Sequence, residues 1–362
     1  MKYVDEFRSL KLSRRLSEKI KSIMPPDEIN IMEVCGTHTQ NFYRFGLDKL
    51  VPENLHLISG PGCPVCVSDQ QYIDIAIELS KDKINMILSF GDMLRVPGSS
   101  STLEQERAAG AHVGMVYSAM DAVKAALDNP QKKIIFLAVG FETTAPTIAL
   151  SIITAKKAKI KNLFFLPALK LIPPAIKFLL LDKRLKISAF LCPGHVSSII
   201  GSNAYEFVPK KYGLPCCVAG FEPVDMLEGL YLLVRQIIDK ESRVDNQYIR
   251  AVTGAGNLKA QKIITSVFQA ADSPWRGLGV IPQSGLKIKD EFAAFDAGKV
   301  FPIRLKATGQ RLKAKCRCGD VLKGLIRPDS CPLFRKSCTP QEPVGPCMVS
   351  QEGACNAYYR YR

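Results

Sequence analysis

One unit recurs along the chain: a short, continuously apolar run, a turn rich in Gly, Pro and polar residues, and then a segment with helically spaced apolar side chains. The apolar runs are INIMEV (29–34), LHLIS (55–59), INMILSF (84–90), KIIFLAV (133–139), LFFLPAL (163–169), ISAFL (187–191) and PCCVA (215–219). Continuous aliphatic runs are typical of strands buried on both faces, as in parallel sheets covered by helices. The repeat therefore predicts an α/β fold.

Four parts are expected along the chain. Residues 1–26 contain one amphipathic helix that stops at Pro25-Pro26, and we expect it to pack with the C-terminal domain. Residues 27–130 and 131–240 should form two similar parallel-sheet α/β domains, and 241–362 a less regular C-terminal domain. The phrases GFETTAPT (140–147) and GFEPVDML (220–227), like the Pro-Gly turns at 61–62 and 193–194, suggest corresponding positions in an internal duplication.

Composition narrows the class of protein. The apolar runs are far shorter than the ~20 residues that cross a bilayer, and the N-terminus has no apolar signal segment. We therefore expect a cytoplasmic protein with no membrane interaction. In such a chain, twelve cysteines indicate metal or redox chemistry more than disulfide bonds.

Chemically capable side chains follow the predicted strands. They are Cys35, His38, Cys63, Cys66, Asp92, Glu142, His195 and Glu222. In open α/β sheets ligands bind at the carboxyl ends of the strands, where the turns into helices lie. These eight residues are our candidates for a catalytic site.

Cys35 and His38 lie in the turn CGTH that ends the first apolar run. A thiolate and an imidazole at this spacing suit iron, copper or zinc, or a nucleophilic mechanism. A buried cysteine is also often inert, and the local sequence leaves both interpretations open.

Cys63 and Cys66 form a Cys-x-x-Cys pair between a strand and a predicted helix. A helix N-terminus favours the thiolate, which suits reversible disulfide chemistry. The alternative is one half of a structural zinc site.

Six further cysteines crowd the C-terminal part: Cys316, Cys318, Cys331, Cys338, Cys347 and Cys355. Irregular spacing among Pro, Gly and basic residues favours an iron–sulfur cluster. A zinc ribbon would prefer two Cys-x-x-Cys knuckles, which this part lacks.

The net charge of +15 is concentrated in the same part, where residues 303–362 hold 12 Lys/Arg and 4 Asp/Glu. Basic charge can bind nucleic acid, but it can equally offset thiolates and an anionic cluster. We expect no nucleic-acid partner, and no P-loop is present.

Several motifs together resemble the HypD family, the maturation proteins of [NiFe]-hydrogenases. They are EVCGTHT, SGPGCPVCV, SFGDMLRVPG, GFETTAPT, CPGHVSSIIG, GFEPVDML and the cysteine-rich tail. The resemblance covers nearly the whole chain, and no motif cysteine departs from it.

The resemblance implies a scaffold that works with a HypC-type chaperone to hold the iron of the nascent Fe(CN)2CO group. HypE, charged by HypF, would supply the cyanides. Cys35 would ligate this iron with His38 beside it, and Cys63 and Cys66 would be redox-active. The family's tail spacing selects Cys316, Cys331, Cys338 and Cys355 as ligands of one [4Fe-4S] cluster and leaves Cys318 and Cys347 as extra thiols.

Two alternatives remain at this point. A general iron–sulfur disulfide reductase would use the cysteines without iron at Cys35. A nucleic-acid-binding iron–sulfur protein would rest on charge alone, with an affinity that falls steeply with salt.

Overall fold

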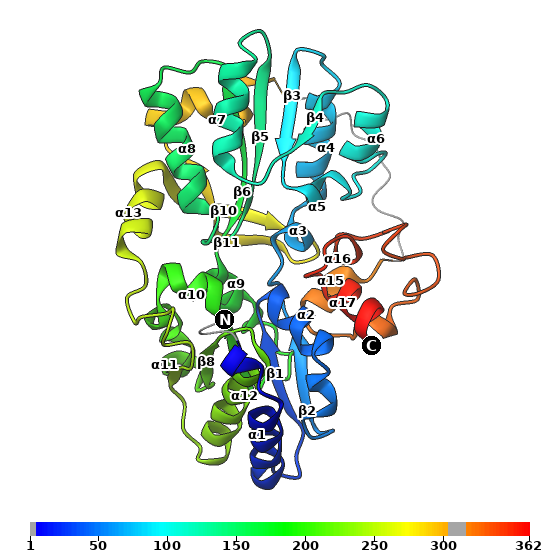
Figure 1. Cartoon of the computed structure of the whole chain (residues 1–362), viewed down its shortest axis with the longest axis vertical. Coiled ribbons are helices and arrows are strands. Elements are labelled where there is room, and N and C mark those ends of the chain that lie inside the picture. Colours follow the sequence, from blue (N-terminus) through cyan, green and yellow to red (C-terminus); the bar gives the residue numbers. More distant parts are fainter. Residues whose placement is uncertain (1–4, 303–315) are drawn as a thin grey trace.

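The computed structural model describes residues 5–302 and 316–362 of the chain. The first four residues of the expected N-terminal part and residues 303–315 of the expected C-terminal domain lie outside these ranges. The described strands form two sheets, one toward each end of the long axis (Figure 1). We call the sheet that contains β1 sheet A and the sheet that contains β3 sheet B. The expected α/β fold is confirmed.

Sheet A has five strands in the order β2-β1-β7-β8-β9, and all neighbours are parallel. Their bounds are Leu55–Ser59 (β2), Ile29–Glu33 (β1), Ala189–Pro193 (β7), Cys216–Ala219 (β8) and Val244–Asn246 (β9).

Sheet B has six strands in the order β10-β11-β6-β5-β3-β4. Their bounds are Phe268–Trp275 (β10), Gly279–Ile288 (β11), Leu163–Lys170 (β6), Lys133–Gly140 (β5), Asn85–Ser89 (β3) and Val113–Met115 (β4). The last four strands are mutually parallel, whereas the β10–β11 hairpin adds to β6 in antiparallel orientation. The expected parallel sheets are confirmed, and the antiparallel hairpin is an addition to the edge of sheet B.

The two sheets share one winding. If the parallel strands of each are numbered along the chain, both follow the order 2-1-3-4, with a fifth strand in sheet A. The winding reverses between strands 1 and 3, and the turns that leave these strands diverge to open a crevice. The switch points lie between β1 and β7 in sheet A and between β3 and β5 in sheet B.

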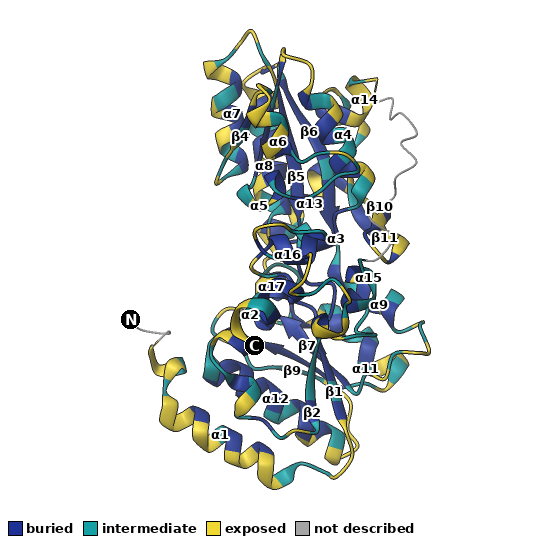
Figure 2. Ribbon diagram, turned by 90° about the vertical axis from the view of Figure 1, so that its right-hand side faces the viewer, coloured by how far each residue is buried: buried dark blue, intermediate teal, exposed yellow. Residues whose placement is uncertain are grey.

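The continuous apolar runs became strands because both faces of each sheet are covered. In β5, Ile134 and Phe136 pack into one hydrophobic cluster and Ile135 and Leu137 into another, on the opposite face. In sheet A, alternate residues such as Leu191 and Cys192 divide in the same way. Figure 2 shows these strands as the buried interior of each half.

Helices fill the connections and cover the faces. Their bounds are Leu10–Ile23 (α1), Gly36–Arg44 (α2), Pro64–Val67 (α3), Gln70–Ser80 (α4), Gly91–Leu94 (α5), Leu103–Ala108 (α6), Ala119–Asp128 (α7), Ala145–Lys157 (α8), Ile172–Leu179 (α9), Gly194–Ile200 (α10), Phe207–Tyr212 (α11), Pro223–Ile238 (α12), Leu258–Val267 (α13), Ala297–Val300 (α14), Cys318–Leu322 (α15), Pro346–Val349 (α16) and Ala354–Tyr361 (α17). Helices α7, α8 and α13 cover one face of sheet B, while α4 and α5 cover the other.

The strands do not divide at the expected boundaries. The expected domain 27–130 contributes β1 and β2 to sheet A but β3 and β4 to sheet B, and 131–240 is divided similarly. The chain crosses between the sheets after β2, after β6 and after β9. Hydrophobic patterning identified seven of the described strands but missed β4, β9, β10 and β11. The pattern also does not record which strands are neighbours in a sheet.

The proposed correspondence of motifs also differs from the structure. GFETTAPT (140–147) follows β5, the third strand of sheet B, whereas GFEPVDML (220–227) follows β8, the fourth strand of sheet A. The sheets are similar in winding, but these phrases are not at equivalent positions.

The N-terminal helix packs differently from our expectation. Helix α1 lies along α12, and its buried Ile20 joins Leu227 and Leu230 of that helix in one cluster. Much of its outer face is exposed (Figure 2). Packing with residues 241–362 was expected, but the main partner of this helix is α12, because the apolar stripe of α12 offers the matching surface. Phe7, just before the helix, does contact Arg250.

The C-terminal segment 316–362 is less regular, as expected, and contains short helices separated by loops. It packs beside α2 and α3 at the middle of the molecule (Figure 1). Among the described residues, no helix has the length and apolar character needed to span a membrane.

Candidate metal and redox site

The carboxyl ends of both sheets lie toward the middle of the molecule (Figure 1). Cys35 follows β1 and His195 follows β7, so they flank the switch point of sheet A. Asp92 follows β3 and Glu142 follows β5, so they flank the switch point of sheet B. Four of the eight candidates therefore lie at the two switch points.

Cys35 is the residue just before α2, and its surroundings are buried. Its backbone N–H donates to Glu33 Oε2 over 2.7 Å, and the Thr39 hydroxyl donates to the other carboxylate oxygen. Burial raises the pKa of the Cys35 thiol to about 12, and the nearby Glu352 and Glu33 carboxyls add to the shift. Burial also raises the pKa of Glu33 to about 8. The free thiol is therefore protonated at neutral pH, and a metal must displace its proton.

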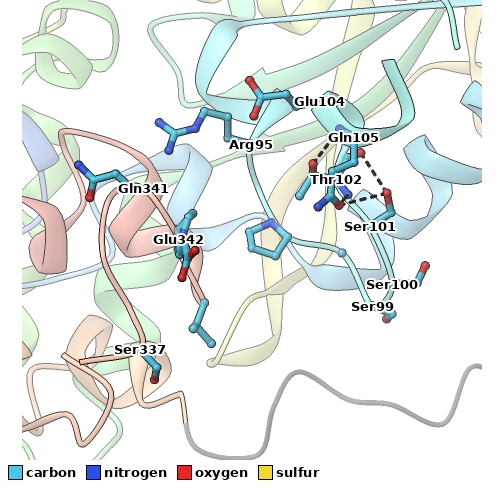
Figure 3. Close-up of a pocket in the computed structure, with 14 residues that line it drawn as sticks. Arg95, Ser99, Ser100, Ser101, Thr102, Glu104, Gln105, Ser337, Gln341 and Glu342 are labelled. Carbon is cyan, nitrogen blue, oxygen red and sulfur yellow. Dashed lines mark hydrogen bonds between the residues drawn. The ribbon is translucent and has the colours of Figure 1, made fainter. Parts of the chain in front are cut away.

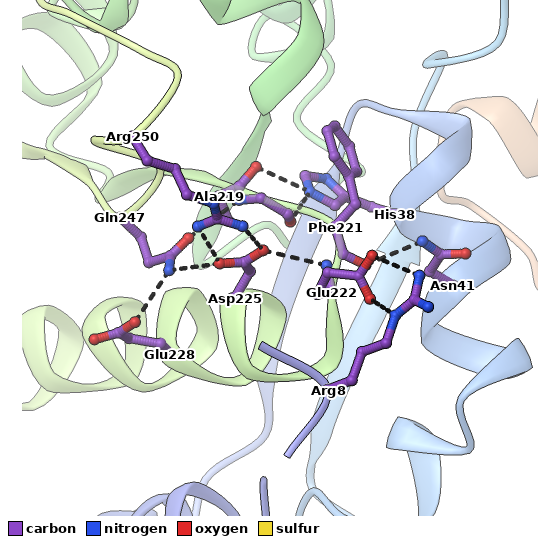
Figure 4. Close-up of polar contacts among 11 residues, drawn as sticks. Arg8, His38, Asn41, Ala219, Phe221, Glu222, Asp225, Glu228, Gln247 and Arg250 are labelled. Atoms are coloured by element: carbon purple, nitrogen blue, oxygen red, sulfur yellow. Dashed lines mark hydrogen bonds and ion pairs between the residues drawn. The ribbon is translucent and has the colours of Figure 1, made fainter. Parts of the chain in front are cut away.

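His38 lies in the first turn of α2 and has no exposed surface. Its Nε2 lies 2.9 Å from the Gly220 carbonyl oxygen and 3.3 Å from that of Ala219, so this nitrogen carries the proton and donates (Figure 4). Burial lowers the pKa of His38 to about 4. The ring is therefore neutral, and Nδ1, which has no partner in the structure, presents an acceptor lone pair.

Phe221 lies between His38 and His195. Its ring centroid is 4.7 Å from that of His38 and 3.9 Å from that of His195, which is stacked on it. Burial lowers the pKa of His195 as well. Two neutral histidines from different strand ends are thus held at fixed positions beside the turn that carries Cys35.

Glu352 was missed by the sequence analysis. Its Oε1 accepts a 2.7 Å hydrogen bond from Thr37 Oγ1, and burial raises the pKa of its carboxyl. The C-terminal segment approaches so closely that a Cβ on Gly36 would lie 2.4 Å from the Glu352 carbonyl oxygen. No local signal marks Glu352, because the contact joins residues more than 300 positions apart.

The Cys63–Cys66 pair lies close to Cys35, because Gly62, the residue before Cys63, packs against the backbone of Cys35. Gly36 N–H donates to the Gly62 carbonyl over 3.1 Å, and a Cβ on Gly62 would lie 2.1 Å from Cys35 N. Cys66 N–H donates to Cys63 Sγ over 3.4 Å. Burial raises the pKa of the Cys66 thiol, so the thiolate expected at a helix N-terminus is not favoured there. Helix α3 has only four residues, and its dipole is correspondingly small.

Six cysteines line one small cavity in the C-terminal segment. They are Cys316, Cys318, Cys331, Cys338, Cys347 and Cys355, together with apolar residues. Cys347 lies within hydrogen-bonding reach of three thiols, those of Cys318, Cys355 and Cys66. The cavity therefore connects directly to the Cys-x-x-Cys pair through Cys347, which the sequence analysis had left as an extra thiol.

The donor set of this cavity fits an iron–sulfur cluster. It offers more thiols than the four that a cluster needs, in an apolar enclosure. No three His, Cys, Asp or Glu side chains in the described ranges are arranged for a single metal ion. The ligands of a cluster surround several irons, so they need not meet at one point. The geometry does not distinguish the four expected ligands from Cys318 and Cys347.

The residues at the end of sheet B have different surroundings. Glu142 is buried, its Oε1 accepts from Ile172 N–H over 2.9 Å, and its Oε2 has no partner. Burial raises the pKa of Glu142 to about 7. Asp92 lines an open pocket with Pro64 and Val65 of α3, and its charge acts on Glu352. Asp92 thus lies near α3 and Glu352, as Cys35 does, whereas Glu142 is buried beside Ile172.

Glu222 is the candidate whose contacts point elsewhere. Its carboxylate forms a two-pronged ion pair with Arg8 (Figure 4). Glu222 is the residue just before α12. These contacts anchor the N-terminal segment to α12, so we assign Glu222 a structural role.

A separate pocket lies between the serine-rich loop at Ser99–Ser101 and the C-terminal segment near Ser337 and Glu342 (Figure 3). The Arg95 guanidinium donates to the Pro340 carbonyl and joins its two sides. No residue expected from the sequence analysis lines this pocket.

Comparison with known proteins shows the family of the chain. The HypD family model, described as "Hydrogenase formation hypA family", matches residues 11–362. The chain is 44% identical to "Hydrogenase maturation factor HypD" of Escherichia coli (strain K12), over all of this chain and 98% of that protein. It is 44% identical to the protein of that name from Azotobacter vinelandii and 42% identical to that from Cupriavidus necator, over all of this chain and 97% of each relative. The chain belongs to the HypD family of hydrogenase formation proteins.

Proposed function

We propose that this hydrogenase maturation factor holds the iron of the nascent Fe(CN)2CO group at Cys35. In this proposal a HypC-type chaperone shares the iron, and HypE, charged by HypF, donates the cyanides. The iron is cargo, which enters the site and leaves it with its diatomic ligands.

The observation that carries the proposal is the setting of Cys35 at the switch point of sheet A. There a buried thiol has a neutral histidine with a free acceptor nitrogen close by in the same turn, with the buried Glu33 and the partly buried Glu352 near it. Soft thiolate sulfur suits low-spin iron. The raised pKa of Cys35 means that iron binding releases a proton, so affinity should rise with pH.

His38 acts in this proposal as a hydrogen-bond acceptor. Because its Nε2–H is used by the Gly220 carbonyl, Nδ1 can accept a hydrogen bond or a proton but cannot donate a hydrogen bond to the iron-bound cyanide or carbonyl. Glu33 holds the Cys35 backbone, and Glu352 fixes Thr37 in the same turn.

Cys316, Cys331, Cys338 and Cys355 would hold a resident [4Fe-4S] cluster, which would supply single electrons. The thiol contacts from the cavity through Cys347 to Cys66 support an electron route to the Cys63–Cys66 pair. The same contacts also suit the second candidate function, a general iron–sulfur disulfide reductase, which needs no iron at Cys35.

Metal analysis after anaerobic co-purification with the chaperone separates the two functions. The proposal predicts about four irons and four sulfides per chain for the cluster, plus one further iron that is lost in Cys35→Ala. An iron content that is the same with and without Cys35 would favour the reductase. Stoichiometric zinc in place of iron would show that the cysteine cavity holds zinc and not an iron–sulfur cluster.

The ligand assignment has its own test. Cys331→Ala and Cys338→Ala should abolish the brown colour and the cluster iron, while Cys318→Ala and Cys347→Ala should retain both. The reverse pattern would mean that the family spacing was misapplied to this chain.

A further inference from the structure

Arg276 is a buried cation whose hydrogen-bonding groups are largely unused. It lies at the tip of the β10–β11 hairpin and is only 4% exposed. Its Nη2 donates to the Pro97 carbonyl over a long 3.4 Å, while Nε and Nη1 have no partner. A buried guanidinium normally engages most of its five N–H groups.

The tip of the β10–β11 hairpin lies between the Cys63–Cys66 pair and the segment that contains Cys316 and Cys318. Arg276 N–H donates over 2.9 Å to the carbonyl of Val67, the residue after Cys66, and Trp275 forms a β-bridge with Ser68. Gly277 packs on Gly319, the residue after Cys318, so closely that a Cβ on Gly277 would lie 2.3 Å from the Gly319 Cα. The positive φ of 77° at Gly277 allows this turn. The backbone thus fixes Arg276 beside both motifs.

No carboxylate neutralises Arg276. None of the ion pairs formed by residues 5–302 and 316–362 includes it. Residues 1–4 and 303–315 contain no Asp or Glu that could serve. An unpaired buried charge is costly. The anion that balances the Arg276 guanidinium therefore has to be a group other than an Asp or Glu side chain of this chain.

The cysteine cavity offers that anion. Cys316 and Cys318 line this cavity, and Gly277, the residue after Arg276, packs on Gly319, the residue after Cys318. The guanidinium charge of Arg276 acts on both thiols. A buried cation held beside the cavity favours negative charge within it.

We propose that Arg276 is the counter-charge of the iron–sulfur group in the cysteine cavity, which it stabilises in its more negative, reduced state. The inference rests on the proposed function in one respect, that the cavity holds such a cluster. Arg276 is a positioning residue here, because it acts on the cluster and not on the cargo.

The test compares the midpoint potential of the cluster in the full-length, anaerobically purified protein and its variants, measured by dye-mediated redox titration at low salt. Arg276→Met removes the charge and the N–H groups, Arg276→Gln keeps N–H donors without charge, and Arg276→Lys keeps the charge without the planar fork. The matched control is Arg317→Met, since Arg317 adjoins Cys316 and Cys318 in sequence but is exposed and paired with Asp320.

Arg276→Met and Arg276→Gln should each disfavour cluster reduction about tenfold, equivalent to about 59 mV for a one-electron couple. Arg276→Lys should shift it less. Arg317→Met should shift it far less than Arg276→Met, because the Arg317 charge, which acts on Cys331, is exposed to solvent and paired with Asp320. Equal potentials in parent and charge-removing variants, or an equal shift in Arg317→Met, would overturn the inference while leaving the cluster in place.

If Arg276→Met is insoluble, Arg276→Gln and Arg276→Lys carry the same comparison. A parent protein that binds no iron would instead overturn the cluster itself, and the inference with it. The two failures are therefore distinguishable by iron analysis before any titration.

Discussion

At the residue scale, burial governs the chemistry around Cys35. Glu33 is almost completely buried with a pKa of about 8, and His38 is completely buried with a pKa of about 4. Both side chains are therefore held uncharged at neutral or slightly acidic pH. The site combines groups that would be charged in water, and folding keeps the neutral form of each.

Glu33 should make stability fall as pH rises. Between about 4.5 and 8 the folded state keeps the Glu33 proton that the unfolded state has lost, so stability declines by at most about 1.4 kcal/mol per pH unit. His38 acts in the opposite sense, but only between about 4 and 6.5. Denaturant titrations from pH 6.5 to 8 should show a shallower decline in Glu33→Gln than in the parent.

The exposed Glu78 provides the control for this titration. Its side chain is about half exposed beside Lys81, so Glu78→Gln should leave the pH slope unchanged. A parent-like slope in Glu33→Gln would show that this carboxyl is not the group that titrates.

Glu222 should behave as an anchor of the N-terminal segment. Its partner Arg8 is half exposed, so solvent screens the pair. Glu222→Gln should lower Tm by less than about 3 °C at low salt, with the difference shrinking at high salt, and it should leave metal content unchanged. Loss of bound iron in this variant would restore Glu222 to the functional site.

At the element scale, the strands with continuous apolar runs and the turns that follow them could be predicted from the sequence, whereas β4, β9 and the β10–β11 hairpin were missed. Apolar runs are read locally, and the carboxyl ends of parallel strands are known ligand sites. Glu352, Cys347 and Arg276 could not be predicted, because each acts through contacts with residues distant in the sequence. The ion pair of Glu222 with Arg8 could not be predicted for the same reason.

The turn after β1 should tolerate no added side-chain atom. Gly36→Ala would place a Cβ 2.4 Å from the Glu352 carbonyl oxygen, and relief requires the C-terminal segment to move. We expect a loss of about 1–3 kcal/mol in the free energy of unfolding, together with faster alkylation of the Cys35 thiol.

Gly298→Ala is the matched control, because the nearest atom to its Cβ would be Asp296 Oδ1 at 3.3 Å. It should cost less than Gly36→Ala and should not change thiol accessibility. Equal effects of both substitutions would mean that the contact at Gly36 is looser than the structure indicates.

At the scale of the whole molecule, the chain crosses three times between two sheets of the same winding. The sequence patterns indicated two similar α/β units but not which strands belong to each, because strand pairing depends on residues that are distant in the sequence. The result is that the carboxyl ends of both sheets lie toward the middle of the molecule, with the cysteine-rich segment packed beside α2 and α3 there (Figure 1). This placement brings the Cys35 turn, the Cys-x-x-Cys pair and the cysteine cavity together.

The interleaved sheets predict that residues 27–130 do not fold alone. In that fragment β1 loses its neighbour β7, and β3 loses its neighbour β5, so neither sheet keeps its centre. Circular dichroism of the isolated fragment should show no cooperative thermal transition, in contrast to the full chain. A monomeric fragment with a sharp transition would restore the expected boundaries.

The central claim, that Cys35 holds the cargo iron, is tested most directly by infrared spectroscopy of the anaerobically purified complex with the HypC-type chaperone. Iron-bound cyanide and carbonyl absorb where protein is nearly silent. The matched control is Cys192→Ala, which removes another buried thiol at the end of a sheet A strand. The account predicts that Cys35→Ala and Cys35→Ser lose the cyanide and carbonyl bands but keep the cluster absorbance, while Cys192→Ala keeps both. Persistence of the diatomic bands in Cys35→Ala would contradict it.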